Sequence, residues 1–126
     1  MKSAISIEFI KNLAQYDYNN NYYDFHNDYS CEKIFYSDSI LLIFFKNLID
    51  GFLLSLKFTE VEITTIDFFN VNEIEGLTLD NLYRGRTQLN GDLIEVSEDG
   101  KGYFYLEFYE GQKLEFWAKD ISVDQV

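Results

Sequence analysis

Proline is absent from this chain of 126 residues, and cysteine and histidine occur once each. The absence of proline excludes polyproline recognition and leaves strands and helices without its breaks. The single thiol, Cys31, has no second cysteine with which to form an intramolecular disulfide or a metal cluster. Such cysteine usage is typical of a reducing compartment, so we expect a cytoplasmic protein.

Long apolar segments are lacking as well. The longest apolar run, Ile40 to Phe45, is far shorter than the ~20 residues that a membrane-spanning helix needs. The N-terminal sequence MKSAISIEFIKNL has neither a long apolar stretch nor a small-residue cleavage site, so we expect no secretory signal. These features predict a protein that makes no contact with a membrane.

Basic residues are scarce: 10 stand against 22 acidic residues, which gives a net charge of −12. Phosphate contacts depend on lysine and arginine, so a field of this sign disfavours nucleic acid and anionic membranes. The same field attracts cationic proteins and accelerates their capture. Plain solubility is the alternative interpretation of the charge. We predict a basic protein partner and no direct contact with nucleic acid.

Apolar and aromatic residues, by contrast, are abundant. Hydrophobic residues make up 47% of the chain and aromatic residues 18%, which is sufficient for a hydrophobic core. The length predicts a single domain over residues 1–126. Large flat side chains pack well across neighbouring strands, so this composition favours pleated sheets.

Alternation and β-branched residues predict most of the strands. The sequences Asp50-Gly51 and Glu98 to Gly102 are hairpin signals between such segments. In residues 103–109 and 113–119, apolar residues alternate with tyrosine, tryptophan and charged residues. One face of these segments is therefore predicted to be core and the other partly exposed to solvent. Strands joined by tight turns form an antiparallel meander. The predicted strands cover residues 33–37, 40–45, 52–58, 61–69, 92–97, 103–109 and 113–119.

Two segments carry helical patterns. In residues 4–15, Ile5, Phe9 and Leu13 recur at four-residue spacing, although Ile5, Ile7 and Phe9 also alternate as on a strand. The second segment begins at Thr78, a potential N-cap, and would end at Gly85. The sequence therefore predicts an α+β fold: a meander of about six or seven strands, able to curl into a half-barrel, with one or two short helices.

Groups able to perform catalysis are few. His26 is the only histidine, so a nucleophilic pair with Cys31 or a serine would have to use it. A solvated loop histidine and a buried thiol are the simpler interpretations. Asp24, His26 and Asp28 alternate, and on a strand they would share a face able to ligate a cation. We predict no catalytic residue, metal or cofactor, with a small metal-binding protein or enzyme centred on these three residues as an alternative.

Two stretches without lysine or arginine concentrate the acidic residues, at 17–32 and at 58–83. Tyrosines interleave with the acids of the first stretch, and tyrosine supplies flat contact area at low entropic cost. Acidic groups around it would meet lysine and arginine on a partner, although a solvated face is the alternative. The predicted partner-binding residues are Asp17, Tyr18, Tyr22, Tyr23, Asp24, Asp28, Glu60, Glu62, Asp67, Glu73 and Glu75.

Arg84 and Arg86 are the only arginines, and they stand together in LYRGR. A guanidinium binds a carboxylate in a bidentate manner. We predict a structural role, in which each arginine holds the end of the second helix to the sheet. Binding an anionic group of a partner is the alternative.

The chain as a whole resembles the small acidic immunity proteins of bacterial contact-dependent and polymorphic toxin systems. The resemblance lies in its acidic, proline-poor, Tyr- and Asn-rich character, in LTLDNLYRGR and in the closing YFYLEFYEGQKLEFWAKDI. It implies a non-enzymatic inhibitor that binds the C-terminal domain of a cognate toxin, a basic DNase or RNase, in the cytoplasm. Such an inhibitor would cover the active site of the toxin or an adjacent exosite. It assigns no role to any individual residue.

An open meander also has edges, and an edge can accept a strand from a partner. A generic sheet-edge adaptor is therefore a further alternative to a toxin inhibitor.

Overall fold

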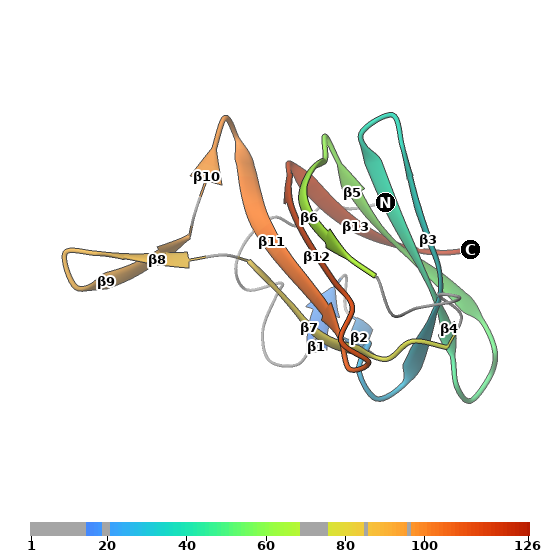
Figure 1. Ribbon diagram of the computed structural model, residues 1–126. Helices are drawn as coiled ribbons and strands as arrows, with labels where there is room; N and C mark the ends of the chain where they lie inside the picture. The colour runs from blue at the N-terminus through green and yellow to red at the C-terminus, as the bar shows by residue number, and fades with distance from the viewer. Residues whose placement is uncertain (1–14, 19–20, 69–75, 85, 96) are drawn as a thin grey trace.

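The computed structural model describes residues 15–18, 21–68, 76–84, 86–95 and 97–126, and every regular element in these ranges is a β-strand (Figure 1). No helix that could cross a membrane is found in the described ranges. The strands are β1 (Gln15–Tyr18), β2 (Asn21–Asp24), β3 (Tyr29–Ser37), β4 (Ile40–Asn47), β5 (Leu53–Thr59), β6 (Glu62–Asp67), β7 (Leu79–Arg84), β8 (Arg86–Leu89), β9 (Asp92–Glu95), β10 (Ser97–Glu98), β11 (Lys101–Phe108), β12 (Lys113–Ala118) and β13 (Asp120–Gln125).

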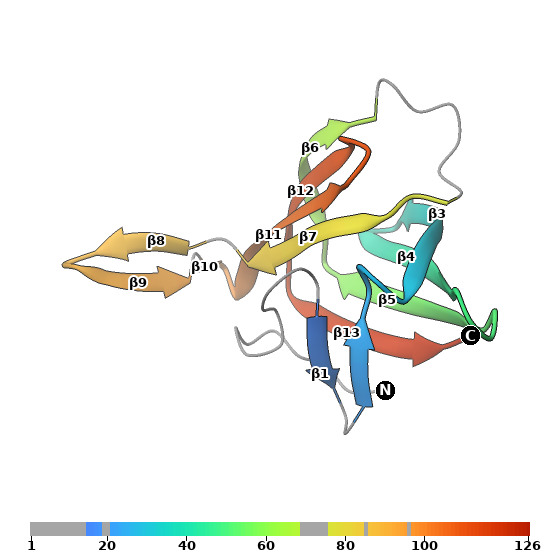
Figure 2. The ribbon, with the colours of Figure 1, turned by 90° about the horizontal axis from the view of Figure 1, so that it is seen from below.

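These strands form two antiparallel sheets and two separate hairpins. The first sheet has the order β13-β5-β4-β3. The second has the order β10-β11-β12-β6, and β7 also pairs with β11. The β1–β2 and β8–β9 hairpins form ladders of their own, and the second of them extends away from both sheets (Figures 1 and 2).

The two sheets share a corner at which one pair of strands passes from one sheet to the other. Asp120 pairs with Thr59 in the first sheet, and Trp117 pairs with Glu62 in the second. Between them, the Lys119 amide donates to the Thr59 carbonyl at 2.9 Å, so the ladder continues through the bend. Glu60 lies at the bend with a φ of +50°. Sheet hydrogen bonding therefore joins the two layers on this side.

A shorter link joins β3 to the chain just before β7. Cys31 and Leu77 form an isolated antiparallel bridge, in which the Cys31 amide donates to the Leu77 carbonyl at 2.7 Å. A single bridge is not a full ladder. The described strands therefore form two curled sheets and no closed barrel.

The core lies between the two sheets and is rich in phenylalanine. Phe58 of β5 contacts Phe104 of β11 and Phe116 of β12, with ring centroids 5.5 and 4.8 Å apart. All three side chains are fully buried. Tilted and edge-on ring pairs of this kind add to the stabilisation from area burial. Because β5 belongs to the first sheet and the other two strands to the second, this cluster packs one sheet against the other.

Replacing Phe58 with alanine should lower the free energy of unfolding by about 3–5 kcal/mol, because a large cavity opens between the sheets. Urea denaturation measures the change. The matched control is Phe52→Ala, since the Phe52 side chain is 62% exposed. We expect the control to change stability by no more than about 0.5 kcal/mol. Equal effects of the two substitutions would contradict this account of the core.

Three two-residue hairpin turns have positive φ at both central positions, as type I′ turns require. Asn90-Gly91 joins β8 to β9 and Asp99-Gly100 joins β10 to β11, each with the glycine that this geometry favours. The turn between β3 and β4 uses Asp38 and Ser39, at φ of 51° and 63°. A non-glycine residue in this region is strained.

Ser39→Gly should therefore raise the free energy of unfolding by about 0.5 kcal/mol. Relief of roughly 1–2 kcal/mol of left-handed strain outweighs the roughly 0.5–1 kcal/mol entropic cost of a glycine. Ser37→Gly, at the end of β3, is the control and should destabilise the protein. Thermal or urea unfolding of both variants tests the prediction, and a loss of stability in Ser39→Gly would refute it.

The prediction of an α+β fold with short helices is wrong: the described residues are all-β. The segment from Thr78 contains β7 rather than a helix. Phe108 pairs with Leu79 and Glu107 with Asn81, so Asp80 is the extra residue of a β-bulge. The bulge lets Leu79 and Leu82 both enter the core at a three-residue spacing that also fits a helix. Of the segment 4–15, residues 4–14 lie outside the described ranges.

The antiparallel pairing is confirmed, but the prediction of a single meander of about six or seven strands is wrong, because the thirteen strands of the described ranges form two sheets and two separate hairpins. The hairpin signals at Asp50-Gly51 and at Asp99-Gly100 both mark observed turns. The apolar faces of β11 and β12 are buried, as the alternation predicts. The segment 92–97 departs from the expected meander, because β9 pairs with β8 and only the short β10 pairs with β11.

Candidate binding surface

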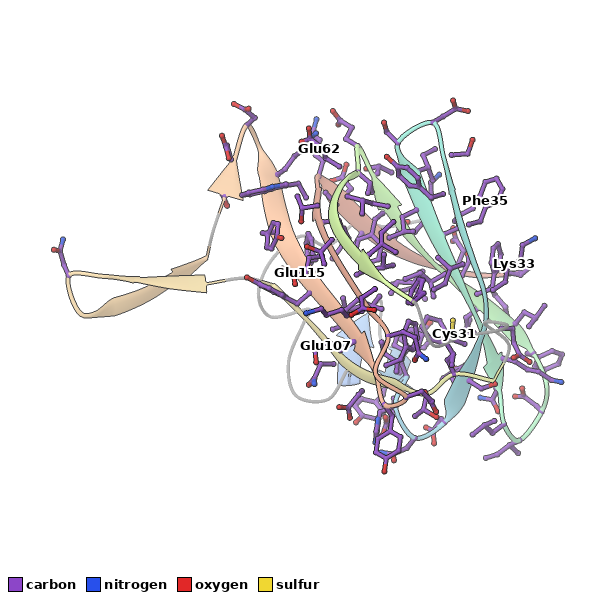
Figure 3. The ribbon with its side chains drawn as sticks, viewed as in Figure 1. Cys31, Lys33, Phe35, Glu62, Glu107 and Glu115 are labelled. Carbon is purple, nitrogen blue, oxygen red and sulfur yellow. The ribbon has the colours of Figure 1, made fainter. Side chains whose placement is uncertain are left out.

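The outer surface of β6, β12 and β11 gathers aromatic and acidic side chains. Alternation along these strands turns Phe104, Leu106, Leu114 and Phe116 into the core and their neighbours outwards. Figure 3 shows Glu62, Glu115 and Glu107 spaced along this sheet, well apart from Lys33 and Phe35 on the other sheet. We name this surface the aromatic face, and it comprises Glu62, Thr64, Tyr103, Tyr105, Glu107, Lys113, Glu115 and Trp117.

Tyr103 is the central ring of the aromatic face. Its ring packs edge-on with Trp117 on the neighbouring strand, at a centroid distance of 4.9 Å, and with Tyr105 on its own strand, at 5.1 Å. The Tyr103 hydroxyl donates to Glu115 Oε1 at 3.1 Å. It also lies 2.6 Å from Thr64 Oγ1, whose single hydroxyl proton is within hydrogen-bond reach of both the Tyr103 oxygen and the Glu115 carbonyl. Tyr103 thus connects the three strands through side-chain contacts.

Burial raises the pKa of Tyr103, and the neighbouring Glu115 carboxylate raises it further, whereas the hydrogen bond with Thr64 acts in the opposite direction. The phenol therefore stays protonated at neutral pH and keeps the hydroxyl proton that it donates to Glu115. This arrangement holds the carboxylate of Glu115 beside the aromatic rings.

Acidic groups outnumber basic groups on and around the aromatic face. Glu62, Glu107 and Glu115 belong to it, and Asp67 lies at the end of β6. Lys113 pairs across the strands with Glu107 and with Asp67, so two carboxylates flank its single charge in the register. Lys101, at the start of β11, pairs with Glu98. The surface therefore favours cationic ligands.

The predicted acids of the central stretch have different surroundings. Glu62 lies on the aromatic face as the register partner of Trp117. Glu60 occupies the bend between the sheets, where its Oε2 lies 3.4 Å from Lys119 Nζ. Both side chains of this pair are exposed, and such surface pairs contribute little to stability. Glu73 and Glu75 lie outside the described ranges.

The predicted residues of the first stretch lie in and after the β1–β2 hairpin. Asp17 pairs with Tyr22, and Tyr18 with Asn21, in the register; the side chains of β1 lie outside the description. The Tyr22 side chain is 59% exposed, whereas Tyr23 packs against the core and stacks on Phe25 at 5.9 Å. Their roles in binding stay predictions.

Asp24 and Asp28 flank the turn that follows β2. The buried Asp24 carboxylate accepts hydrogen bonds from the Asn27 amide at 3.0 Å and from Asn27 Nδ2 at 2.8 Å. The Asp28 amide donates to the Asp24 carbonyl, and the Asp28 side chain is exposed. Asp24 was predicted to bind a partner, but in the structure its carboxylate stabilises this turn.

His26 is oriented towards β7. Its Nδ1 lies 2.7 Å from the Leu79 carbonyl oxygen, to which it donates, and 3.9 Å from Asp80 Oδ1. Asp24 is the last residue of β2, whereas His26 and Asp28 lie in the turn that follows it, so the three residues do not share a strand face. Within the described ranges, no three His, Cys, Asp or Glu side chains form a group that could hold a metal ion. The geometry gives no support to the alternative of a metal site centred on these residues.

Arg84 and Arg86 lie on β7 and β8. The helix end that they were predicted to hold does not exist, because this segment is extended. In the register, Arg84 pairs with Phe104 and Arg86 with Glu95. The side chains of both arginines lie outside the description, and their structural role stays a prediction.

The thiol of Cys31 is fully buried within the core, next to the bridge with Leu77. Burial raises the pKa of Cys31 from 9.0 to about 12, so the thiol stays protonated at neutral pH. A thiolate nucleophile is therefore disfavoured at this position.

The free energy of unfolding should fall as the pH rises from 9.0 towards about 12, because only the unfolded thiol ionises in this window. The slope should be about 1.4 kcal/mol per pH unit. Below pH 9.0 this contribution is fully present, since the folded pKa is the raised one. Urea denaturation of the wild type and of Cys31→Ala tests the prediction. The measurements run from about pH 8, one unit below the window, to about pH 11, two units inside it.

The difference between the two proteins isolates the thiol, because Tyr29 and Tyr103, whose pKa values are also raised, are present in both. Stability curves that run parallel at all pH values would show that Cys31 is not protected from ionisation.

Sequence reasoning missed Tyr103, Glu115 and Trp117 as binding residues. The binding residues were predicted from stretches without lysine or arginine, and residues 101–119 contain three lysines. The alternation of 103–109 and 113–119 was the available signal, because it places these side chains on one face. Only the register, which pairs Tyr103 with Trp117 and Tyr105 with Glu115, brings them into one cluster.

A second exposed surface lies at the turn between β4 and β5. Leu48, Ile49 and Phe52 are 62%, 90% and 62% exposed, and the Val126 amide donates to the Leu53 carbonyl beside them. We name this surface the hairpin tip. It is apolar, in contrast to the aromatic face.

No protein-family model and no curated protein matches the chain. The functional interpretation therefore rests on the residues and their geometry.

Proposed function

We propose that the chain is an immunity protein: a non-enzymatic inhibitor that binds a cationic toxin domain, a DNase or RNase, in the cytoplasm. The observation that carries this proposal is the aromatic face, where Tyr103, Tyr105 and Trp117 lie among outward-facing carboxylates. The resemblance in sequence character to immunity proteins supports it further.

The composition of the aromatic face suits a protein interface. Tyrosine and tryptophan are enriched among the residues that dominate binding energy, because they bury large areas with few rotatable bonds. The rings stand on β11 and β12, whose opposite faces are packed in the core. A partner would therefore meet a surface that loses little conformational entropy on binding.

The charge of the protein determines which partner fits. A net charge of −12 attracts basic surfaces, and nuclease domains bear such surfaces because they hold a polyanion. Carboxylates on the inhibitor would occupy the positions of phosphate groups. Binding would then block access of nucleic acid to the toxin.

Purified protein and the basic C-terminal domain of a secreted protein encoded directly upstream should form a complex. Its association rate constant should fall about tenfold or more between 50 and 500 mM NaCl, since screening removes long-range attraction. Biolayer interferometry measures the rate, and co-expression should restore growth to cells that produce the domain. A salt-independent rate, or no protection of growth, would count against the proposal.

The contribution of the aromatic face can be separated from that of bulk charge. Glu62→Gln combined with Glu107→Gln should slow association more than the charge-matched control, Asp38→Asn combined with Asp124→Asn. Asp38 lies at the β3–β4 turn and Asp124 on β13, so both belong to the first sheet and neither is part of the aromatic face. Equal slowing by the two pairs would assign the effect to net charge alone.

A sheet-edge adaptor is the second candidate, and β3 is the observation that favours it. This strand pairs with β4 along its length, but its other side has a bridge only at Cys31 in the described ranges. Beyond that bridge, Lys33 and Phe35 are exposed. A strand from a partner could add there. Protection of the β3 amides from hydrogen exchange on binding would favour this mode over the aromatic face.

A further inference from the structure

We propose that Glu115, Tyr103 and Trp117 form an anchor site that receives an arginine side chain of the partner. This inference deepens the proposed function and rests on it. It names the part of the aromatic face that binds most strongly and the chemical group that it binds.

Glu115 occupies the middle of the aromatic face. It lies on β12, the strand between β6 and β11, and its register partners are Thr65 on one side and Tyr105 on the other. Residues that dominate binding energy cluster at the centre of an interface, where the surroundings exclude water. Glu62 and Glu107 lie nearer to the ends of the sheet (Figure 3).

The Glu115 carboxylate is held in one orientation with acceptor capacity remaining. Its Oε1 accepts the Tyr103 hydroxyl at 3.1 Å, and Thr64 donates to the backbone carbonyl of the same residue. A carboxylate offers about four lone-pair sites, so this one can also accept the parallel N–H groups of a guanidinium. Tyr103 is therefore a positioning residue for Glu115.

The rings next to this carboxylate favour arginine over lysine. Tyr103 contacts both Trp117 and Tyr105 edge-on, so a cation at Glu115 would lie against several aromatic rings. A guanidinium is planar, more weakly hydrated than an ammonium, and stacks on aromatic faces while it binds a carboxylate. An ammonium lacks the flat shape and the fork of donors.

The hairpin tip is the competing surface. It is the more apolar of the two, but nothing in the structure shows what would cover it. The excess of carboxylates over amines on and around the aromatic face, by contrast, specifies a cationic occupant.

Trp117 gives the test a local signal, because it is the only tryptophan in the chain. The protein is titrated with tetra-arginine and with tetra-lysine peptides of equal charge in low salt, and the fluorescence of Trp117 is recorded. Tetra-arginine should change the fluorescence with an apparent Kd at least threefold lower than that of tetra-lysine. Equal responses to the two peptides, or no response to either, would overturn the proposal.

Variants then separate the anchor from general charge. Glu115→Gln keeps the shape of the side chain and an acceptor for Tyr103, and it should weaken tetra-arginine binding at least threefold. Tyr103→Phe should weaken it by a smaller factor, through loss of positioning. The charge-matched control Asp38→Asn should leave it unchanged. An unaltered Kd in Glu115→Gln would refute the anchor, and thermal unfolding of each variant verifies that it is folded.

The same variants, tested with the toxin domain, distinguish this inference from the function on which it rests. If the domain binds and Glu115→Gln lowers its affinity while Ile49→Ser at the hairpin tip does not, the anchor is supported. If the domain binds with unaltered affinity for Glu115→Gln, the anchor is wrong and the proposed function stands. A loss confined to Ile49→Ser would move the interface to the hairpin tip.

Discussion

The bend at which a pair of strands passes from one sheet to the other governs the rest of the structure. The ladder of β5 with β13 continues into that of β6 with β12 through the hydrogen bond between Lys119 and Thr59. Because β5 runs into β6 and β12 into β13 at this bend, the two layers are joined there and face each other. Phe58 then meets Phe104 and Phe116 between them. The same constraint turns the opposite sides of β11 and β12 towards solvent, so core and candidate surface follow from one bend.

The only cysteine, the only histidine and the buried Asp24 all have structural contacts. Cys31 forms the bridge with Leu77, and His26 donates to the Leu79 carbonyl, so the only cysteine and the only histidine both attach the β2–β3 region to the start of β7. Asp24 stabilises the intervening turn through Asn27. These contacts link the two sheets on the side away from the shared corner. Carboxylates and aromatic rings predominate on the outer surface of the second sheet, and such groups are suited to binding.

Sequence reasoning found antiparallel strands but not their division into two sheets, and it located the candidate site incompletely. Period-two alternation is a local property, and it correctly placed Phe104 and Phe116 inside and Tyr103 and Trp117 outside. The bulge at Asp80 changes the spacing of the buried residues Leu79 and Leu82 from two to three. Their segment was therefore predicted to be a helix. Acidic residues were judged by their neighbours along the chain. That criterion included Asp24, whose carboxylate is buried in a turn, and omitted Glu115, which has lysines near it in sequence but Tyr103 across the strands.

The sequence by itself determined the charge, the prevalence of strands and the faces that β11 and β12 present, because these depend on composition and on a two-residue period. The tertiary structure alone decided which strands are neighbours and where the bend and the bulges fall. Those features arise from pairing between segments up to about half the chain apart, such as β6 with β12, for which the local pattern holds no information. The aromatic face exists only through that pairing, since its members come from three strands and meet across the register.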